Sequence, residues 1–574
     1  MKIRLIHYFA FQDKKMDFKN IKKITGSFTS KSIKGDFTGG LTAAIIALPM
    51  GLAFGLQSGL GPQAGLYTAI ILALLASIVA GTKTLISDPT GPMTIVAATI
   101  IAEAGFNGIG KIPVVIILSF ALGGIFQIMF GFIKVAQYVK YISYPVLSGF
   151  MGGIGIIIIL TQWHTFLGGE RPGGIIDIIL DLHTPIIEYH WSSIILGSLT
   201  LVFIYFIPKI SKKIPAGLIS LIIGTLVSFT FKKEWGWHWD YSTIGEIPSD
   251  LPQIVLPFSE FLNISFSEFS IAVVSGLTLA GLGTIDTLLT SVVADNLTKT
   301  KHNGNRELIG QGIGNFVAAL FGGLPGAGST TGTVANINSN GKTNMSGIFK
   351  AIFLLIVLVG LGPLLKDVPK PVLSALLISV GIGIIDFKGM KKLFSLKNSD
   401  SLVLLLVVVL TVFVDLLVAV GIGMVLSSFF FMQRMGELVD QQSKSGDINE
   451  IEKKLKIPES IKNRIMVYEL DGPLFYGFSD QFKEQAEAII GKDAVIINMS
   501  QVPYIDASGT YVLEEVIKNF KDKKVEVILV GVKDHIFKQF EEFKVIPNTL
   551  AEEKAYNSVR AGLKYLKFQL EEKK

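Results

Sequence analysis

The sequence contains no cysteine. This absence excludes disulfide bonds, thiolate metal sites and cysteine nucleophiles, although it leaves the cellular compartment open. No nucleophile with a neighbouring base and no metal-ligating cluster stands out along the chain, so the residues do not favour an enzyme. The lysine-rich segment 1–34 lacks an apolar stretch followed by a cleavage site. We therefore expect a cytoplasmic N-terminal segment and no signal peptide.

Charged side chains are scarce. They make up 17% of the 574 residues, against 50% hydrophobic residues, and the mean hydropathy is +0.53. A chain this apolar needs a lipid bilayer around it. The net charge of +6 is compatible with nucleic-acid binding, but the basic residues lie in short loops between apolar runs. Membrane topology explains them better, and we expect no nucleic-acid partner.

Long apolar runs predict an α-helical membrane domain over residues 35–436, with fourteen spans in two sets of seven. The runs of the first set are Phe37–Leu56, Ala64–Ala80, Pro89–Ala104, Pro113–Ile133, Pro145–Leu167, Ser192–Ile207 and Pro215–Phe231. Those of the second set are Ser267–Thr290, Glu307–Phe321, Ser329–Asn338, Met345–Leu365, Pro371–Ile385, Leu402–Leu417 and Ala419–Met432.

The third and tenth runs are interrupted by glycine and proline where they begin. The third opens with Ser87-Asp88-Pro89-Thr90-Gly91-Pro92, and the tenth follows Leu324-Pro325-Gly326-Ala327-Gly328. Paired interruptions at corresponding positions predict a 7+7 inverted repeat with two half-helices and a binding site near the middle of the membrane. The alternative is that each interruption is an ordinary kink.

Lysine and arginine gather in alternate loops. These loops are cytoplasmic if the N-terminus is inside, whereas the long loops 168–191 and 232–266 are rich in aspartate and glutamate. This distribution follows the positive-inside rule. It predicts a multi-pass protein of the cell inner (plasma) membrane with both termini in the cytoplasm.

The composition changes after Arg434. Residues 437–462 are charged and contain glycine and serine, which predicts a linker. Strand-like and helix-like segments alternate over residues 463–574. They predict a small cytoplasmic α/β domain.

Asp286 is a carboxylate in the middle of an apolar helix. A lone carboxylate there costs about 2.5–3.5 kcal/mol, so it should face a cavity. Thr290 lies one turn further on the same face. With carbonyls of the interrupted helix, such as that of Gly328, these groups are the hard oxygen ligands that Na⁺ requires. The alternative is a buried aspartate that caps or braces a neighbouring helix.

A small anion is expected between the two half-helix starts, where free N–H groups carry partial positive charge. The expected contacts are Thr90, Gly91, Met93, Gly328, Ser329 and Thr330, with Phe54, Gln57 and Tyr67 as candidate cavity walls. No fixed cation follows Ser329 to offset Asp286, so a bound Na⁺ would cancel its repulsion of the anion and couple the two ions. Protonation of Asp286 would also cancel this repulsion. Proton-coupled symport of sulfate or a dicarboxylate is therefore the alternative.

Several stretches resemble the SulP anion transporters, the sulfate permease or solute-carrier-26 family. They are Ala47-Leu48-Pro49, Gly65-Leu66-Tyr67-Thr68-Ala69, Ser87-Asp88-Pro89-Thr90-Gly91-Pro92 and Val412-Phe413-Val414-Asp415-Leu416. The C-terminal domain resembles a STAS domain. Residues 283–295 with 307–315 are similar to the sodium-dependent bicarbonate transporters of this family.

The resemblance implies a core domain (about 35–133 and 267–365) that moves as an elevator against a gate domain (about 140–231 and 370–436), and a homodimer. It also implies that Asp286 and Thr290 are sodium ligands. The expected function is Na⁺-coupled bicarbonate symport without an organic cofactor. A membrane-bound STAS signalling receptor and, within the same fold class, a nucleobase carrier are the alternatives.

Tyr504-Ile505-Asp506-Ala507-Ser508-Gly509 resembles the Asp-x-Ser-Gly phosphorylation motif of anti-sigma-factor antagonists. The resemblance makes Ser508 a candidate phosphorylation site, and a phosphate would be favourable at a helix N-terminus. The alternative is that these residues only cap a helix. A cytoplasmic partner would bind through this domain.

Overall fold

The computed structural model describes residues 30–572, apart from residues 80, 107–109, 173, 212–214, 235–240, 246–250, 256–263, 397, 443, 448–463 and 476–490. Most of the expected N-terminal segment and of the expected linker therefore lies outside the described residues. The chain forms two compact units, Met1–Met424 and Val425–Lys574.

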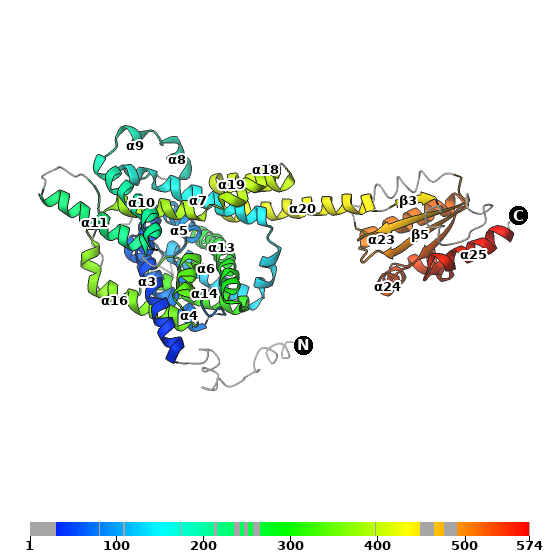
Figure 1. Cartoon of the computed structure of the whole chain (residues 1–574), viewed down its shortest axis with the longest axis horizontal. Coiled ribbons are helices and arrows are strands. Elements are labelled where there is room, and N and C mark those ends of the chain that lie inside the picture. Colours follow the sequence, from blue (N-terminus) through cyan, green and yellow to red (C-terminus); the bar gives the residue numbers. More distant parts are fainter. Residues whose placement is uncertain are drawn as a thin grey trace. The chain divides into compact units, whose positions relative to one another are not determined.

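The first unit consists almost entirely of helices, drawn from blue to yellow in Figure 1. Its first half contains α3 (Ser30–Ser58), α4 (Pro62–Val79), α5 (Gly91–Glu103), α6 (Val114–Phe132), η1 (Val135–Tyr141), α7 (Tyr144–Leu167), α8 (Ile175–Leu180), α9 (Thr184–Ile187), α10 (Trp191–Ile210) and α11 (Ala216–Glu234). The second half contains α13 (Phe266–Thr298), α14 (Gly304–Leu320), α15 (Thr330–Asn338), α16 (Met345–Leu365), α17 (Lys370–Ile384), α18 (Phe387–Leu396), α19 (Ser399–Phe413) and the beginning of α20 (Leu416–Gln442), whose remaining residues belong to the second unit.

A helix lies at each predicted apolar run, and the predicted helical membrane fold is confirmed. Eight helices of the described residues are long and apolar enough to cross a membrane, or nine if the bent pair α17 and α18 is one span. The others are shorter or more polar; α15, for example, has only 9 residues. The count of fourteen spans therefore stays a prediction.

The helices of the first unit pack in two groups. In the first, α6 packs against α13 and α14, while α3 and α4 pack against each other and against α16. In the second, α7 packs against α17 and α19, and α10 packs against α11 and α17. The groups meet where α3 contacts α11 and α17, and where α5 contacts α7. We call the first group the core and the second the gate.

Glycines allow very close helix packing inside the core. A Cβ atom on Gly65 of α4 would lie only 1.9 Å from the carbonyl oxygen of Gly51 on α3. Between α6 and α14, a Cβ on Gly312 would lie 2.5 Å from the carbonyl oxygen of Gly124. Small residues at such contacts let helices approach to the van der Waals distance that stabilises membrane bundles.

The two interrupted runs cross each other inside the core. Strands β1 (Ser87–Asp88) and β2 (Ala327–Gly328) pair in antiparallel fashion, with Ser87 opposite Gly328. Helix α5 begins after β1 and helix α15 begins after β2. The crossing therefore brings the N-terminal ends of two short helices to the same place.

Three segments differ from the sequence-based expectations. The loop 168–191 contains the short helices α8 and α9, and the lysine-rich loop after α17 is the helix α18. In α18, Leu393 is buried whereas Lys388, Lys391 and Lys392 are exposed. Helix α20 continues to Gln442 and is followed by the strand β3 (Lys444–Asp447), so the predicted linker 437–462 begins with regular structure.

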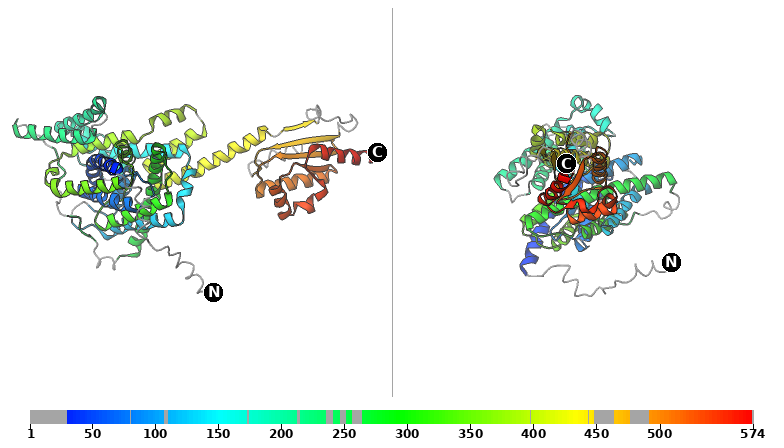
Figure 2. Two further views of the ribbon diagram at one scale, coloured as in Figure 1. Left: turned by 60° about the horizontal axis from the view of Figure 1, so that its bottom comes forward. Right: turned by 90° about the vertical axis from the view of Figure 1, so that its right-hand side faces the viewer.

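The second unit is the predicted α/β domain, drawn in orange and red in Figures 1 and 2. Its sheet has the order β3-β4-β5-β6-β7, with β4 (Ile465–Asp471), β5 (Ala494–Gln501), β6 (Glu526–Val530) and β7 (Ala555–Tyr556) parallel and β3 antiparallel. Alternating strand residues form two buried clusters. One includes residues of α23 (Ala507–Asp522) and α24 (Asp534–Glu542), and the other residues of α25 (Val559–Glu572), so helices cover both faces.

Candidate functional site

Asp286 lies in the middle of α13, in the part of the helix that contacts β2, α5 and α15. Among the described residues its carboxylate forms no ion pair, and its buried Oδ2 has no hydrogen-bond partner. The side chain of Thr90, the residue that precedes α5, lies beside the carboxylate, and its buried hydroxyl has no other hydrogen-bond partner among the described residues. An unpaired carboxylate thus adjoins the start of a half-helix.

The next turn of α13 is bound to the other half-helix start. Thr290 Oγ1 donates to the carbonyl oxygen of Gly328 at 2.8 Å and lies 2.8 Å from Thr330 Oγ1. Thr287 Oγ1 accepts the N–H of Gly328 at 3.2 Å. The structure thus brings the predicted ligands Thr290 and Gly328 into direct contact, with Asp286 one turn away on the same helix.

At the start of α15, some backbone N–H groups are already hydrogen-bonded and others are free to bind a ligand. Ser329, the residue before the helix, donates its N–H to the carbonyl oxygen of Ile86 at 2.7 Å, and its own side chain accepts the N–H of Gly332 at 3.2 Å. Within the described residues, no hydrogen bond uses the N–H groups of Thr330 and Thr331. The donors left for a ligand are therefore those of Thr330 and Thr331, whereas the N–H of Ser329 is already engaged.

The start of α5 offers fewer donors. Thr90 accepts the N–H of Thr94 at 2.9 Å through its carbonyl oxygen, and Pro92 has no N–H to give. Gly91 and Met93 carry the N–H groups that remain. A Cβ atom on Gly91 would lie 2.8 Å from Cδ1 of Ile158, a residue of the gate helix α7, so the gate packs directly on this helix start.

Side chains of the core satisfy the irregular backbone around the crossing. Asn315 holds Gly326 from both sides, accepting its N–H at 2.8 Å and donating to its carbonyl oxygen at 2.9 Å. Thr333 Oγ1 accepts the N–H of Ile86 at 3.0 Å, and Thr68 Oγ1 donates to the carbonyl oxygen of Leu324 at 2.8 Å. Irregular backbone is stable at membrane depth only when its polar groups are satisfied in this way.

A buried ion pair behind the crossing has no counterpart in the sequence-based expectations. Lys350 of α16 is fully buried; its Nζ pairs with the carboxylate of Asp88 and donates to the carbonyl oxygen of Ser87 at 2.6 Å. The sequence did contain a signal for it, because Lys350 lies inside the apolar run Met345–Leu365. A charge at such a position needs a partner of opposite charge. The pair fixes β1 against α16.

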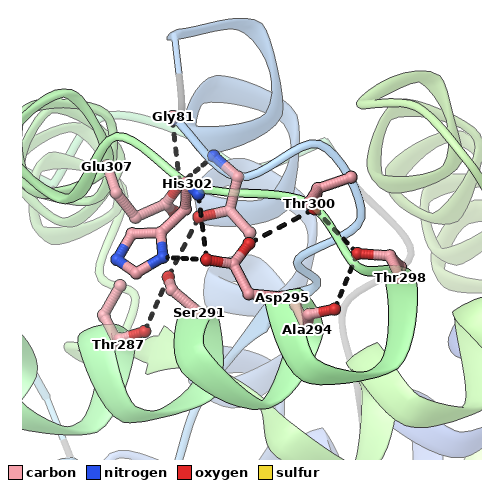
Figure 3. A network of polar contacts seen from close by, with 10 residues as sticks. Gly81, Thr287, Ser291, Ala294, Asp295, Thr298, Thr300, His302 and Glu307 are labelled. Atoms are coloured by element: carbon pink, nitrogen blue, oxygen red, sulfur yellow. Dashed lines mark hydrogen bonds and ion pairs between the residues drawn. The ribbon is translucent and has the colours of Figure 1, made fainter.

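A polar network, drawn in Figure 3, lies at the end of α13 that leads into α14. Asp295 Oδ2 lies 2.7 Å from Nδ1 of His302, and the buried Glu307 accepts the N–H of Gly81 at 2.9 Å. Ser291 Oγ donates to the carbonyl oxygen of Thr287 at 3.0 Å. These bonds fix the loop between α4 and β1 and the loop between α13 and α14 to the core helices.

The candidate wall residues lie at different places. Phe54 is fully buried on α3, and Tyr67 is half-buried on α4. Gln57 lines a separate cavity, where its Nε2 donates to Thr161 Oγ1 of the gate helix α7 at 3.1 Å. Gln57 therefore connects core and gate.

In the second unit, Ser508 is the second residue of α23 and is half-buried. The cap of this helix is Asp506, whose side chain accepts the N–H of Gly509 at 2.7 Å. Ser508 is thus not required as the cap.

Two family models match the chain. The model described as "Sulfate permease family" matches residues 33–407, and the STAS domain model matches residues 456–560. The "Bicarbonate transporter BicA" of Picosynechococcus sp. is 38% identical over 91% of this chain and 93% of its own length. The protein of the same name from Synechocystis sp. is 37% identical over 91% and 92%, respectively.

Solved structures agree with these matches. The transmembrane domain of a cyanobacterium bicarbonate transporter BicA aligns with a TM-score of 0.62 at 41% identity, covering 69% of this chain and all of that domain. The murine Solute Carrier 26 family member A9 anion transporter shares the fold, with a TM-score of 0.80 over 98% of this chain and 97% of its own, at 18% identity. The family and the relatives are transporters, not enzymes. The chain belongs to the sulfate permease (SulP) family of anion transporters and carries a C-terminal STAS domain.

Proposed function

We propose that the protein is a secondary transporter that carries bicarbonate together with Na⁺. Its 37–38% identity to proteins named bicarbonate transporters, over nine-tenths of the chain, supports the anion. One observation supports the coupling above all: the carboxylate of Asp286 forms no ion pair among the described residues and lies beside Thr90, at the start of α5. A cation beside it would turn a repulsive site into one that holds an anion.

Asp286, Thr290 and the carbonyl of Gly328 are the proposed Na⁺ ligands, because they supply only oxygen atoms. The proposed anion lies between the starts of α5 and α15, near Thr90, Gly91, Met93, Gly328, Ser329 and Thr330. The N–H groups of Thr330, Thr331, Gly91 and Met93 are the donors, since the N–H of Ser329 is bound to Ile86. Two helix N-termini carry roughly one positive charge together, which matches a monovalent anion.

Transport would proceed by an elevator movement of the core against the gate, in a homodimer of the inner (plasma) membrane with both termini in the cytoplasm. The separate packing of the two helix groups supports this movement. Because every proposed ligand belongs to the core, the site would travel as one body. The STAS domain would then lie in the cytoplasm, where a partner could reach it.

Uptake of labelled bicarbonate, sulfate and fumarate into proteoliposomes tests the proposal. Each anion is offered with a Na⁺ gradient, with a pH gradient and with neither. We expect bicarbonate uptake that requires the Na⁺ gradient. Uptake of sulfate or fumarate driven by the pH gradient alone would instead support proton-coupled symport, and no flux of any anion would support a STAS signalling receptor.

Replacing Thr330 with proline is expected to lower the affinity for bicarbonate about tenfold, since one of the free N–H groups disappears. The fold should survive, because proline is favourable at the first position of a helix and the extended backbone of Ser329 (φ −85°, ψ 112°) suits the residue before proline. Thr330→Ala is the matched control, since it keeps the N–H and removes the side-chain hydroxyl that contacts Thr290 together with the γ-methyl group. An unchanged KM for bicarbonate in Thr330→Pro would place the anion elsewhere.

Ser508 is proposed as a phosphorylation site of the STAS domain. Its position in the first turn of α23 would place a phosphate at the positive end of the helix. Mass spectrometry of the protein purified from its native cells would detect this modification. A consistently unmodified Ser508 would leave the motif as part of a capped helix start.

A further inference from the structure

A cavity of about 240 Å³ lies between the core helix α3 and the gate helices α7, α10 and α17. It is separate from the crossing of β1 and β2, and its walls include the loop that follows α7. The lining residues are Ala53, Leu56, Gln57, Thr161, Gln162, Thr165, Gly168, Gly169, Glu170, Arg171, Ser193, Ser242, Lys370, Pro371, Leu373 and Leu377. We call it the seam cavity.

The seam cavity has an excess of positive charge. Arg171 and Lys370 are partly buried in its wall, while Glu170 is exposed. Arg171 donates from Nη1 to the carbonyl oxygen of Gln57 at 3.1 Å, and neither it nor Lys370 forms an ion pair among the described residues. A partly buried charge is screened less by salt than a surface charge, so these two cations attract an anion more strongly than surface lysines do.

Neutral polar groups in the same wall also lack partners. Ser193 is fully buried, and its hydroxyl has no hydrogen bond among the described residues. The same is true of Oε1 of Gln57, which is 6% exposed. Buried polar groups are normally satisfied by protein, water or ligand. The hydroxyl of Ser193 is therefore a donor that the fold itself does not use.

We propose that the seam cavity is a second anion site, which binds a small inorganic anion between Arg171 and Lys370 with a hydrogen bond from Ser193. The size favours such an anion over an organic ligand, since pockets for organic ligands usually measure about 300–1,000 Å³. The identity of the anion as bicarbonate rests on the proposed function, whereas the site itself rests on the cavity, its charges and its unused donor.

The position of the site gives it a role in transport. One wall belongs to the core and the others to the gate, so a movement of the core changes the shape of the cavity. An anion that binds it in one arrangement stabilises that arrangement. The site therefore binds the anion near the transport pathway. It also shifts the equilibrium between the arrangements of core and gate.

Lys370→Gln is the variant of choice, since Arg171 also bonds to Gln57 and its loss would change more than charge. The backbone N–H of Lys370, which donates to the carbonyl oxygen of Ser242 at 2.8 Å, is kept. Lys366→Gln is the matched control, because this exposed lysine lies four residues away and does not line the cavity.

Equilibrium dialysis of ¹³C-labelled bicarbonate, and of chloride and sulfate, against the full-length protein in detergent counts the sites. Bicarbonate is expected to occupy two sites in the unmodified protein, and in Thr330→Pro one of them should bind about tenfold more weakly while the other is unchanged. Adding Lys370→Gln to Thr330→Pro should weaken this unchanged site about tenfold, and Lys370→Glu should weaken it further, whereas Lys366→Gln should change nothing.

Two results would overturn the second site. One is the complete loss of binding of all three anions in Thr330→Pro alone. The other is an equal effect of Lys370→Gln and Lys366→Gln, which would indicate surface charge only. Because dialysis measures binding without flux, a failure of bicarbonate transport would leave this test intact: chloride or sulfate would still fill the cavity if the site is real.

Discussion

Replacing Asp286 with asparagine is expected to abolish sodium-stimulated anion uptake while the protein remains folded. The neutral amide removes the charge that Na⁺ would balance and leaves only neutral oxygens as ligands. The fold should tolerate the change, because the carboxylate forms no ion pair among the described residues, and a neutral group costs less at membrane depth than a carboxylate. Uptake by the variant should not change when Na⁺ is added.

A matched control exists on the same helix. Asp295→Asn also removes one carboxylate from α13, but Asp295 pairs with His302 in the loop before α14. This variant should keep its sodium dependence. Measuring both variants over a range of Na⁺ concentrations distinguishes a lost Na⁺ site from a generally impaired protein. If Asp286→Asn kept full sodium dependence, the Na⁺ site would have to be placed elsewhere.

Replacing Lys350 with methionine is expected to destabilise the core by about 3–5 kcal/mol. The variant leaves Asp88 buried without its cation, and removing one partner of a buried ion pair costs this much. The carbonyl oxygen of Ser87 loses its donor as well. Thermal unfolding of the purified full-length protein would show the effect as a large fall in the midpoint temperature.

The double variant Lys350→Met with Asp88→Asn separates charge from packing. It removes both charges, so it should recover part of the lost stability, because replacing a whole buried pair is far less costly than breaking it. Lys366→Met, in an exposed position at the end of α16, should leave the midpoint unchanged. A single Lys350→Met variant as stable as this control would mean that the pair does not stabilise the crossing.

The sequence predicted the two helix starts correctly, because one local rule was enough for them. Glycine and proline at the two interrupted runs located the helix starts, and the spacing of Asp286 and Thr290 put both side chains on one face of α13. The structure adds the direct bond between Thr290 and the carbonyl of Gly328, which agrees with that reasoning. The helical membrane fold and the α/β domain followed from hydropathy and alternation in the same way.

Other features depended on contacts between distant parts of the chain. The N–H of Ser329 is bonded to the carbonyl oxygen of Ile86 because the pairing of β1 with β2 brings the two residues together. No residue near Ser329 in the sequence predicts this bond. Lys350 and Asp88 are more than two hundred residues apart, so their pairing appears only after folding. Likewise, the seam cavity exists only where core and gate meet.

The hydroxyl groups of Thr290 and Thr330 carry one proton each, and this decides how they can act. Thr290 points its proton at the carbonyl oxygen of Gly328, so the contact of 2.8 Å between the two hydroxyls must use the proton of Thr330. The hydroxyl of Thr330 thus donates to the hydroxyl of Thr290, and the hydroxyl of Thr290 donates to the carbonyl oxygen of Gly328. Thr330 could therefore donate to the proposed anion only through its backbone N–H, because its side-chain proton is already used in the contact with Thr290.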